Sequence, residues 1–236
     1  MLEAHVYVCH VNLVAMSFSW PFQGRWKARW AIGVLTLLVL PLGFIPLLGY
    51  AVAATRGASA DPSNGPPPWK LSIRLLSDGL WAALLLLLLT APFGLALNPL
   101  ADGLDQAHLW HVSDHVLSHI YALVGAAFIV ALPWGLVLLV LVPHGIRRYA
   151  SSGSPLDLFD FPAAIRDVRR DFATWNVAAA AMVTAWAIGL ACSGLLCVGI
   201  LPGIFYAILV SAHACAALET APRAWPSASG ANPPAG

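Results

Sequence analysis

A stretch of 25 residues without a charge, from Trp30 to Ala54, limits what this chain can fold into. A helix that crosses a bilayer needs about 20 consecutive apolar residues, so the stretch is long enough to do so. Pro41 and Pro46 interrupt it, and a proline removes a backbone donor and clashes with the preceding turn. The sequence therefore predicts a membrane segment that bends between Leu40 and Pro46, either as a broken span or as a re-entrant hairpin.

The rest of the chain is also unusually apolar. Of its 236 residues 59% are hydrophobic and only 10% are charged, whereas roughly a quarter of the residues in soluble proteins are charged. This composition predicts an integral, multi-pass membrane protein of the all-α class, with a single helical membrane domain over residues 18–220. Uncharged stretches predict four transmembrane helices, near residues 79–97, 120–142, 177–198 and 202–218, with the last two joined by a turn near residues 199–203.

The two ends of the chain have a different character. Residues 1–17 have no basic start and no small-residue cleavage signature, so we interpret them as an N-terminal tail rather than a signal peptide. Met16 precedes a basic run rich in tryptophan, which makes it an alternative start to Met1. Residues 221–236 are rich in proline, serine and alanine, and this composition predicts a disordered tail.

The charges outside the apolar stretches predict a topology. Residues 100–118 contain three aspartates and no lysine or arginine, whereas residues 147–175 contain five arginines. Because basic loops stay in the cytoplasm, residues 100–118 are predicted to lie outside the cell and residues 147–175 in the cytoplasm. Residues 56–74 and the C-terminal tail then also lie inside.

A short amphipathic helix is predicted within the basic segment. Asp160 is a capping acid and Pro162 suits the first turn, so the helix should begin there. Apolar residues then recur at three- and four-residue spacing, which is typical of a helix lying on a membrane. It is interpreted either as a plain connector or as a site that recognises an anionic lipid, and its candidate lipid-contacting residues are Arg166, Arg169 and Arg170.

Four histidines form the sharpest cluster in the sequence: His108, His111, His115 and His119. On a helix they fall within about 80° of one face. Imidazoles four residues apart can share zinc or copper, and a carboxylate such as Asp105 can complete the site. Four ligands along one helix cannot surround one ion, so the candidate ligands are pairs drawn from His111, His115 and His119. The same histidines can instead be the wet side of an interfacial helix or a pH sensor.

Two other polar residues lie inside apolar surroundings. Asp78 precedes the first confident span, where a first-turn acid is favoured by the helix dipole. His213 lies within the last apolar segment, and we expect it to be a hydrogen-bonded interior histidine.

Several short motifs occur in a characteristic order: IPLLGY at 45–50, PPPW at 66–69, SDGL at 77–80 and LPGIFYAILVSAHACA at 201–216. Their order and spacing resemble those of the domain-of-unknown-function family 4013, over roughly Phe18 to Leu218. The family consists of prokaryotic polytopic membrane proteins, so the resemblance implies a helical architecture and a place in the inner or plasma membrane. It implies no activity and supplies no catalytic residue. The histidine-bearing outer stretch is not part of the resemblance.

The sequence favours a protein without enzymatic activity. It contains no phosphate-binding Walker loop, no nucleophile elbow and no HExxH zinc motif. A net charge of +1 and scattered basic residues exclude a nucleic-acid partner. The spans carry no charge at their centres, which argues against an ion-coupled pump. The favoured function is a membrane scaffold or accessory subunit, bound to lipid and to a membrane-protein partner or a second copy; the alternative is a transporter or channel-like protein for a small neutral or lipidic solute.

Overall fold

The computed structural model describes residues 15–106, 115–194 and 199–220, and in these parts the chain forms helices and no strand. The α-helices are α2 (Trp26–Leu38), α3 (Phe44–Ala60), α4 (Ile73–Gln106), α5 (His115–Ser152), α6 (Phe161–Arg170), α7 (Phe172–Ala191) and α8 (Ile200–Thr220), and the short 3-10 turns are η1 (Trp20–Phe22), η2 (Pro155–Phe159) and η3 (Cys192–Gly194). Four helices, α4, α5, α7 and α8, are long and apolar enough to cross a membrane. The predicted all-helical class with four such helices is confirmed. The predictions for residues 1–14 and for the tail 221–236 lie outside the described residues.

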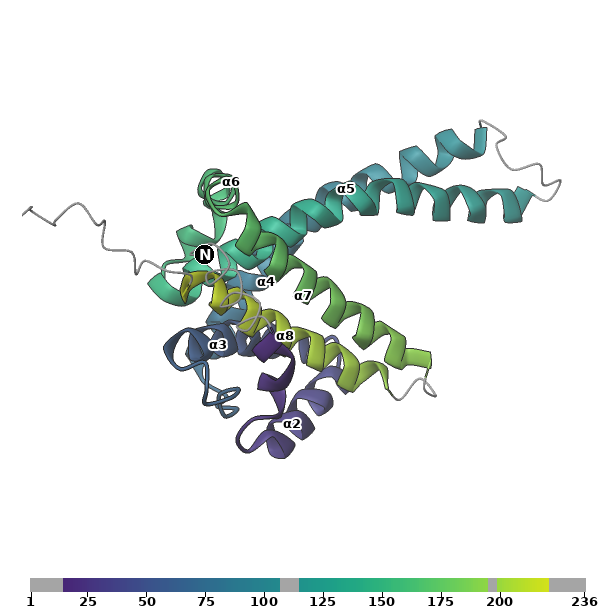
Figure 1. The fold of residues 1–236 in the computed structure, drawn as a ribbon. Coiled ribbons are helices and arrows are strands. Elements are labelled where there is room, and N and C mark those ends of the chain that lie inside the picture. The colour runs from purple at the N-terminus through teal and green to yellow at the C-terminus, as the bar shows by residue number, and fades with distance from the viewer. Residues whose placement is uncertain (1–14, 107–114, 195–198, 221–236) are drawn as a thin grey trace, which may run out of the picture.

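The long helices form two hairpins, α4–α5 and α7–α8, which diverge from a shared end (Figure 1). At that end Arg56 Nε of α3 donates to the carbonyl of Ala150 in α5, at 3.1 Å. Arg147 Nη1 of α5 donates to the carbonyl of Leu218 in α8, at 3.3 Å. The shared end, called the base below, therefore holds the C-terminal ends of α3, α5 and α8 together with the N-terminal ends of α4 and α7. Residues 56–74, residues 147–175 and the end of α8 therefore lie at the same end of the helical bundle.

The proline-broken stretch is bent where the sequence predicts. Helix α2 ends at Leu38 and α3 begins at Phe44, so the break covers the first proline. Both ends of the stretch return to the loop before α4, because Trp69 Nε1 donates to the carbonyl of Arg29 at 3.1 Å and Tyr50 Oη donates to the carbonyl of Pro67 at 2.8 Å. The two helices of the stretch therefore form a hairpin, called the α2–α3 hairpin below; its placement in a membrane stays a prediction.

The hairpin closes around a single aromatic side chain of α8, Phe205. Its ring is fully buried. It lies 5.7 Å from the ring of Trp30, edge to face, and 6.0 Å from the ring of Tyr50. A Cβ atom on Gly33 would lie 2.2 Å from this ring, so only glycine lets α2 approach it. The contact between the first and last helices of the bundle therefore depends on one bulky residue facing one residue without a side chain.

Glycines also allow close crossings of α3 with α4 and of α7 with α8. A Cβ atom on Gly49 of α3 would lie 1.9 Å from the carbonyl oxygen of Leu75 in α4. A Cβ atom on Gly189 of α7 would lie 2.6 Å from the carbonyl oxygen of Gly203 in α8. Small residues at such crossings allow backbones to pack against each other, which is the usual way in which helices associate in lipid.

Two predicted helix ends differ from the structure. Helix α4 continues through Pro99 to Gln106, because a proline kinks a helix without having to end it where neighbouring turns keep their bonds. The predicted turn near residues 199–203 is wrong, since α7 already ends at Ala191 and α8 begins at Ile200. Pro202 therefore lies in the first turn of α8, where a missing backbone N–H costs nothing.

Candidate functional site

The charged side chains are excluded from the middles of the long helices. No Asp, Glu, Lys or Arg occurs in residues 79–101, 115–146, 172–191 or 200–218. The charges of the described residues lie instead at the base, where some of them form three groups, and at the tip near the end of α4. The base is therefore where polar chemistry can take place.

The first group is centred on Asp78, which is only 4% exposed. Its carboxylate accepts a hydrogen bond from Tyr149 Oη at 2.7 Å and pairs with Arg56 Nη1 at 3.2 Å. The three residues come from α4, α5 and α3, so one buried carboxylate holds three helices together. The interpretation of Asp78 as a first-turn acid is wrong, because α4 begins at Ile73 and the aspartate is more than one turn inside the helix.

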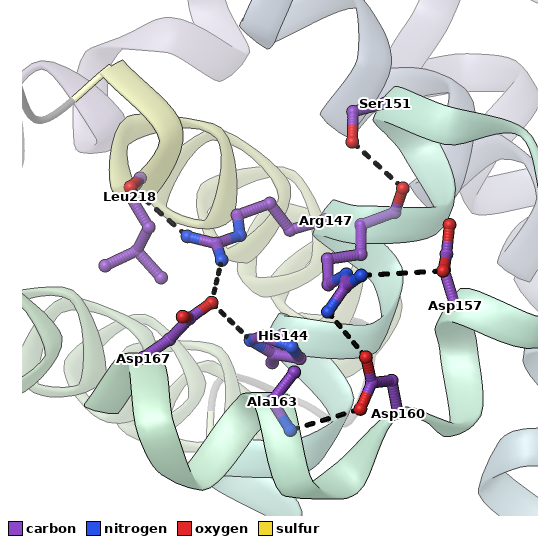
Figure 2. Close-up of polar contacts among 9 residues, drawn as sticks. His144, Arg147, Ser151, Asp157, Asp160, Ala163, Asp167 and Leu218 are labelled. Atoms are coloured by element: carbon purple, nitrogen blue, oxygen red, sulfur yellow. Dashed lines mark hydrogen bonds and ion pairs between the residues drawn. The ribbon is translucent and has the colours of Figure 1, made fainter. Parts of the chain in front are cut away.

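The second group surrounds His144 (Figure 2). This histidine is 1% exposed, and its Nδ1 lies 3.5 Å from Asp167 Oδ2 of α6. The same oxygen pairs with Arg147 Nη2 at 3.0 Å. His144 and Arg147 are three residues apart on α5 and so point to the same neighbour. The guanidinium of Arg147 also lies 6.0 Å from the ring centroid of Trp175, within the range of a cation–π contact.

The third group is formed by Arg148, which pairs with two aspartates (Figure 2). Its Nη1 lies 2.8 Å from Asp160 Oδ2 and its Nη2 lies 3.6 Å from Asp157 Oδ1. The other oxygen of Asp160 accepts the backbone N–H of Ala163 at 3.1 Å. The predicted capping role of Asp160 is confirmed, and the same carboxylate also fixes α6 to α5.

These groups tie helices together and offer little access for a substrate. The imidazole of His144 is sealed from solvent. The Ser151 hydroxyl donates to the carbonyl of Arg148 in its own helix. The pairs formed by Arg56, Arg147 and Arg148 join helices of the same chain. Breaking the pair of Arg56 with Asp78 would leave a carboxylate that is only 6% exposed without its cation. In the part of the chain that the structure describes, the arrangement at the base is that of a structural joint.

The candidate lipid-contacting residues lie on the outer side of this joint. Arg166, Arg169 and Arg170 are all exposed on α6. Within the described ranges no acidic partner pairs with any of the three, whereas Arg147 and Arg148 of α5 are both paired. Their role as lipid contacts stays a prediction.

The histidine face is described only in part. His108 and His111 lie outside the described residues, and His115 and His119 lie in the first turns of α5. His119 Nδ1 is 3.6 Å from Asp105 Oδ2 of α4. Among the described residues no group of three potential ligands comes together. The predicted zinc or copper site at His111, His115 and His119 stays a prediction.

The joint at His144 is the feature that sequence reasoning missed. The sequence held a sign of this joint, because residues 147–175 contain Asp157, Asp160 and Asp167 beside the five arginines. Only the arginines were used to predict the topology. A second interior histidine was anticipated correctly: His213 is 1% exposed and its Nδ1 lies 2.8 Å from Ser17 Oγ.

The family model described as "Protein of unknown function (DUF4013)" matches residues 32–210, which is more than half of the chain. The chain belongs to this family. The resemblance carried by the short motifs is thereby confirmed. The DUF4013 match runs from α2 into α8, so it includes the α4–α5 hairpin, α7 and the first half of α8. Comparisons with curated proteins and with solved structures find no match.

Proposed function

We propose that this chain is a multi-pass protein of the cell membrane that acts as a non-enzymatic scaffold or accessory subunit. The observation that carries the proposal is the α4–α5 hairpin. In the most apolar 18 residues of each helix, only 6% of the stretch in α5 and 17% of the stretch in α4 is buried inside the chain. The corresponding share in α8 is 56%. A helix pair that packs so little against its own chain is suited to pack against another membrane helix.

The placement of charge supports the direction of insertion. The lysines and arginines of the described residues all lie in segments that meet at the base, at 25–29, 56–74 and 147–170. Asp102 and Asp105 lie at the opposite tip, near the end of α4. With the base in the cytoplasm every basic segment obeys the positive-inside rule. The α2–α3 hairpin then enters and leaves the membrane on the cytoplasmic side.

The interior argues against transport of a charged solute. Ion pathways and proton relays usually need ionisable groups within the membrane. Here the middles of the long helices carry no Asp, Glu, Lys or Arg. Thr90, a polar residue of α4, donates to the carbonyl of Leu86 in its own helix. The hairpins therefore present apolar surface rather than a polar path.

Photo-crosslinking in intact cells tests the proposal. A benzoylphenylalanine at Phe128 of α5 or at Leu87 of α4, both exposed, should give a discrete protein adduct. The same probe at Leu156, exposed at the base, is the matched control and should not give that adduct. Lipid adducts alone at both hairpin positions, together with solute uptake by the protein reconstituted alone, would refute the scaffold and favour a transporter.

A further inference from the structure

The base separates its charges into an inner and an outer set. Asp157, Asp160 and Asp167 all turn towards α5, where they pair with Arg147 and Arg148 (Figure 2). Two arginines thus occupy three acids. The remaining basic residues of this segment, Arg166, Arg169 and Arg170, are exposed on α6 and make no ion pair with these three aspartates. The outer surface of α6 therefore carries positive charge that its own acids do not neutralise.

Apolar side chains are exposed beside this charge. Ile165 lies on α6, Leu156 lies just before it and Phe172 just after it, and all three are exposed, Leu156 to 81%. A surface in contact with water alone gains nothing from such residues. Basic residues interleaved with exposed apolar ones are typical of helices that lie in the headgroup layer of a membrane.

The direction of α6 fits that layer. In Figure 1 α6 is seen end-on, whereas α7, which follows it directly, runs along the plane of the picture. Helix α6 thus lies crosswise to α7. If α7 crosses a membrane, α6 lies along its surface, with the short turn at Asp171 between them.

A second segment at the base repeats the pattern. Lys70 and Arg74 are exposed at the start of α4, and Leu71 and Ile73 between them are exposed as well, Ile73 to 88%. This segment lies at the same end of the bundle, because α4 contacts both η2 and the C-terminal end of α5 near Tyr149. Two segments far apart in the sequence therefore present exposed cations and apolar side chains at the base.

We propose that the base is a binding surface for an anionic lipid leaflet, in which Arg166, Arg169 and Arg170 bind headgroup phosphates while Ile165 and Leu156 enter the acyl region. A guanidinium group can donate two parallel hydrogen bonds to the oxygens of one phosphate. These hydrogen bonds are stronger where water is scarce. The apolar residues select a membrane over a soluble polyanion, which would leave them in water. The inference goes beyond the scaffold function, because it needs no protein partner.

Lipid selectivity of the full-length chain tests the proposal. The protein is placed in nanodiscs with equal amounts of phosphatidylglycerol and phosphatidylcholine, and the relative association of the two is measured with spin-labelled lipids. We expect the wild type to prefer phosphatidylglycerol, by up to about fivefold for each arginine that touches a headgroup. The triple variant R166Q/R169Q/R170Q should lose the preference, and the matched variant R166K/R169K/R170K, which keeps the charge, should retain most of it.

Two further arms separate the possible results. Inorganic phosphate, added in exchange for chloride at constant low ionic strength, should leave the preference intact, since a leaflet binds through many headgroups and apolar contacts together. Displacement by phosphate under these conditions would show a simple anion site instead. If the triple glutamine variant does not fold, the wild type is titrated with salt, which should abolish the preference by screening exposed charges. A preference that survives high salt, or that is the same in the glutamine and lysine variants, overturns the proposal.

Discussion

The crossing of α3 and α4 gives a sharp prediction for a single methyl group. In a Gly79→Ala variant the new Cβ atom would lie 2.0 Å from the carbonyl oxygen of Ile45 and 2.9 Å from the backbone nitrogen of Gly49. An ordinary contact of this kind needs well over 3 Å, so α3 would have to move by more than an ångström. The obstacle is backbone on both sides, which cannot turn away as a flexible side chain can.

The size of the effect follows from two opposed contributions. Overpacking a well-packed site costs about 1–3 kcal/mol, and a rigid backbone obstacle belongs at the upper end. Alanine in place of glycine inside a helix returns about 1 kcal/mol. We therefore expect Gly79→Ala to lower the free energy of unfolding by about 2 kcal/mol. The displaced α3 also carries Arg56, so the pair with Asp78 should weaken in the same variant.

The same helix offers a matched control. A Cβ atom on Gly94 of α4 would have no heavy atom within 4 Å, so Gly94→Ala should be neutral or stabilising by up to about 1 kcal/mol. The two variants should then differ by about 3 kcal/mol in unfolding by SDS in mixed micelles, followed by circular dichroism. Equal stability of the Gly79→Ala and Gly94→Ala proteins would refute the close crossing.

Three other predictions concern the base, the topology and the tip. Asp78→Asn should lower the free energy of unfolding by about 3–5 kcal/mol, because it leaves the guanidinium that it pairs with in a poorly solvated place; mixed-micelle unfolding measures this, and a loss under 1 kcal/mol contradicts it. Single cysteines at the exposed positions Ser19 and Ser151 should be labelled from the cytoplasmic side, and one at Gly103 from the outside; labelling of Ser19 and Gly103 from the same side would contradict the hairpin. Zinc or copper bound by the purified protein should be lost in His115→Ala, and unchanged metal content would leave the histidines as a polar face.

Local patterns were sufficient for the elements of this fold. Two prolines five positions apart, Pro41 and Pro46, predicted the break between α2 and α3, and the Asp160 and Pro162 pair predicted the start of α6. Both features act through the backbone of their own neighbours, so the sequence alone contains the cause. The spans followed from the absence of charge for the same reason.

The joint at the base could not be predicted in the same way. Arg56 and Asp78 are separated by 22 residues, and Tyr149 is a further 71 residues from Asp78. Which of several arginines meets which aspartate depends on how α3, α4 and α5 cross, and that depends on glycines whose partners lie on other helices. Counting the arginines near residue 147 treated these charges as free, whereas Arg147 and Arg148 are paired internally.

The N-terminal segment and α8 have a consequence for how the chain is made. Ser17 bonds to His213 across 196 residues, and the fully buried Phe205 fills the space between α2 and α3. At about 5–20 residues per second, the ribosome needs roughly 10–40 s to deliver the partner of the first segment. During that interval the α2–α3 hairpin lacks Phe205, the side chain that packs between its two helices. The N-terminal segment can thus complete its packing only after α8 has been made. A chain truncated before α8 should therefore have its packing defect at the N-terminal end, around α2 and α3.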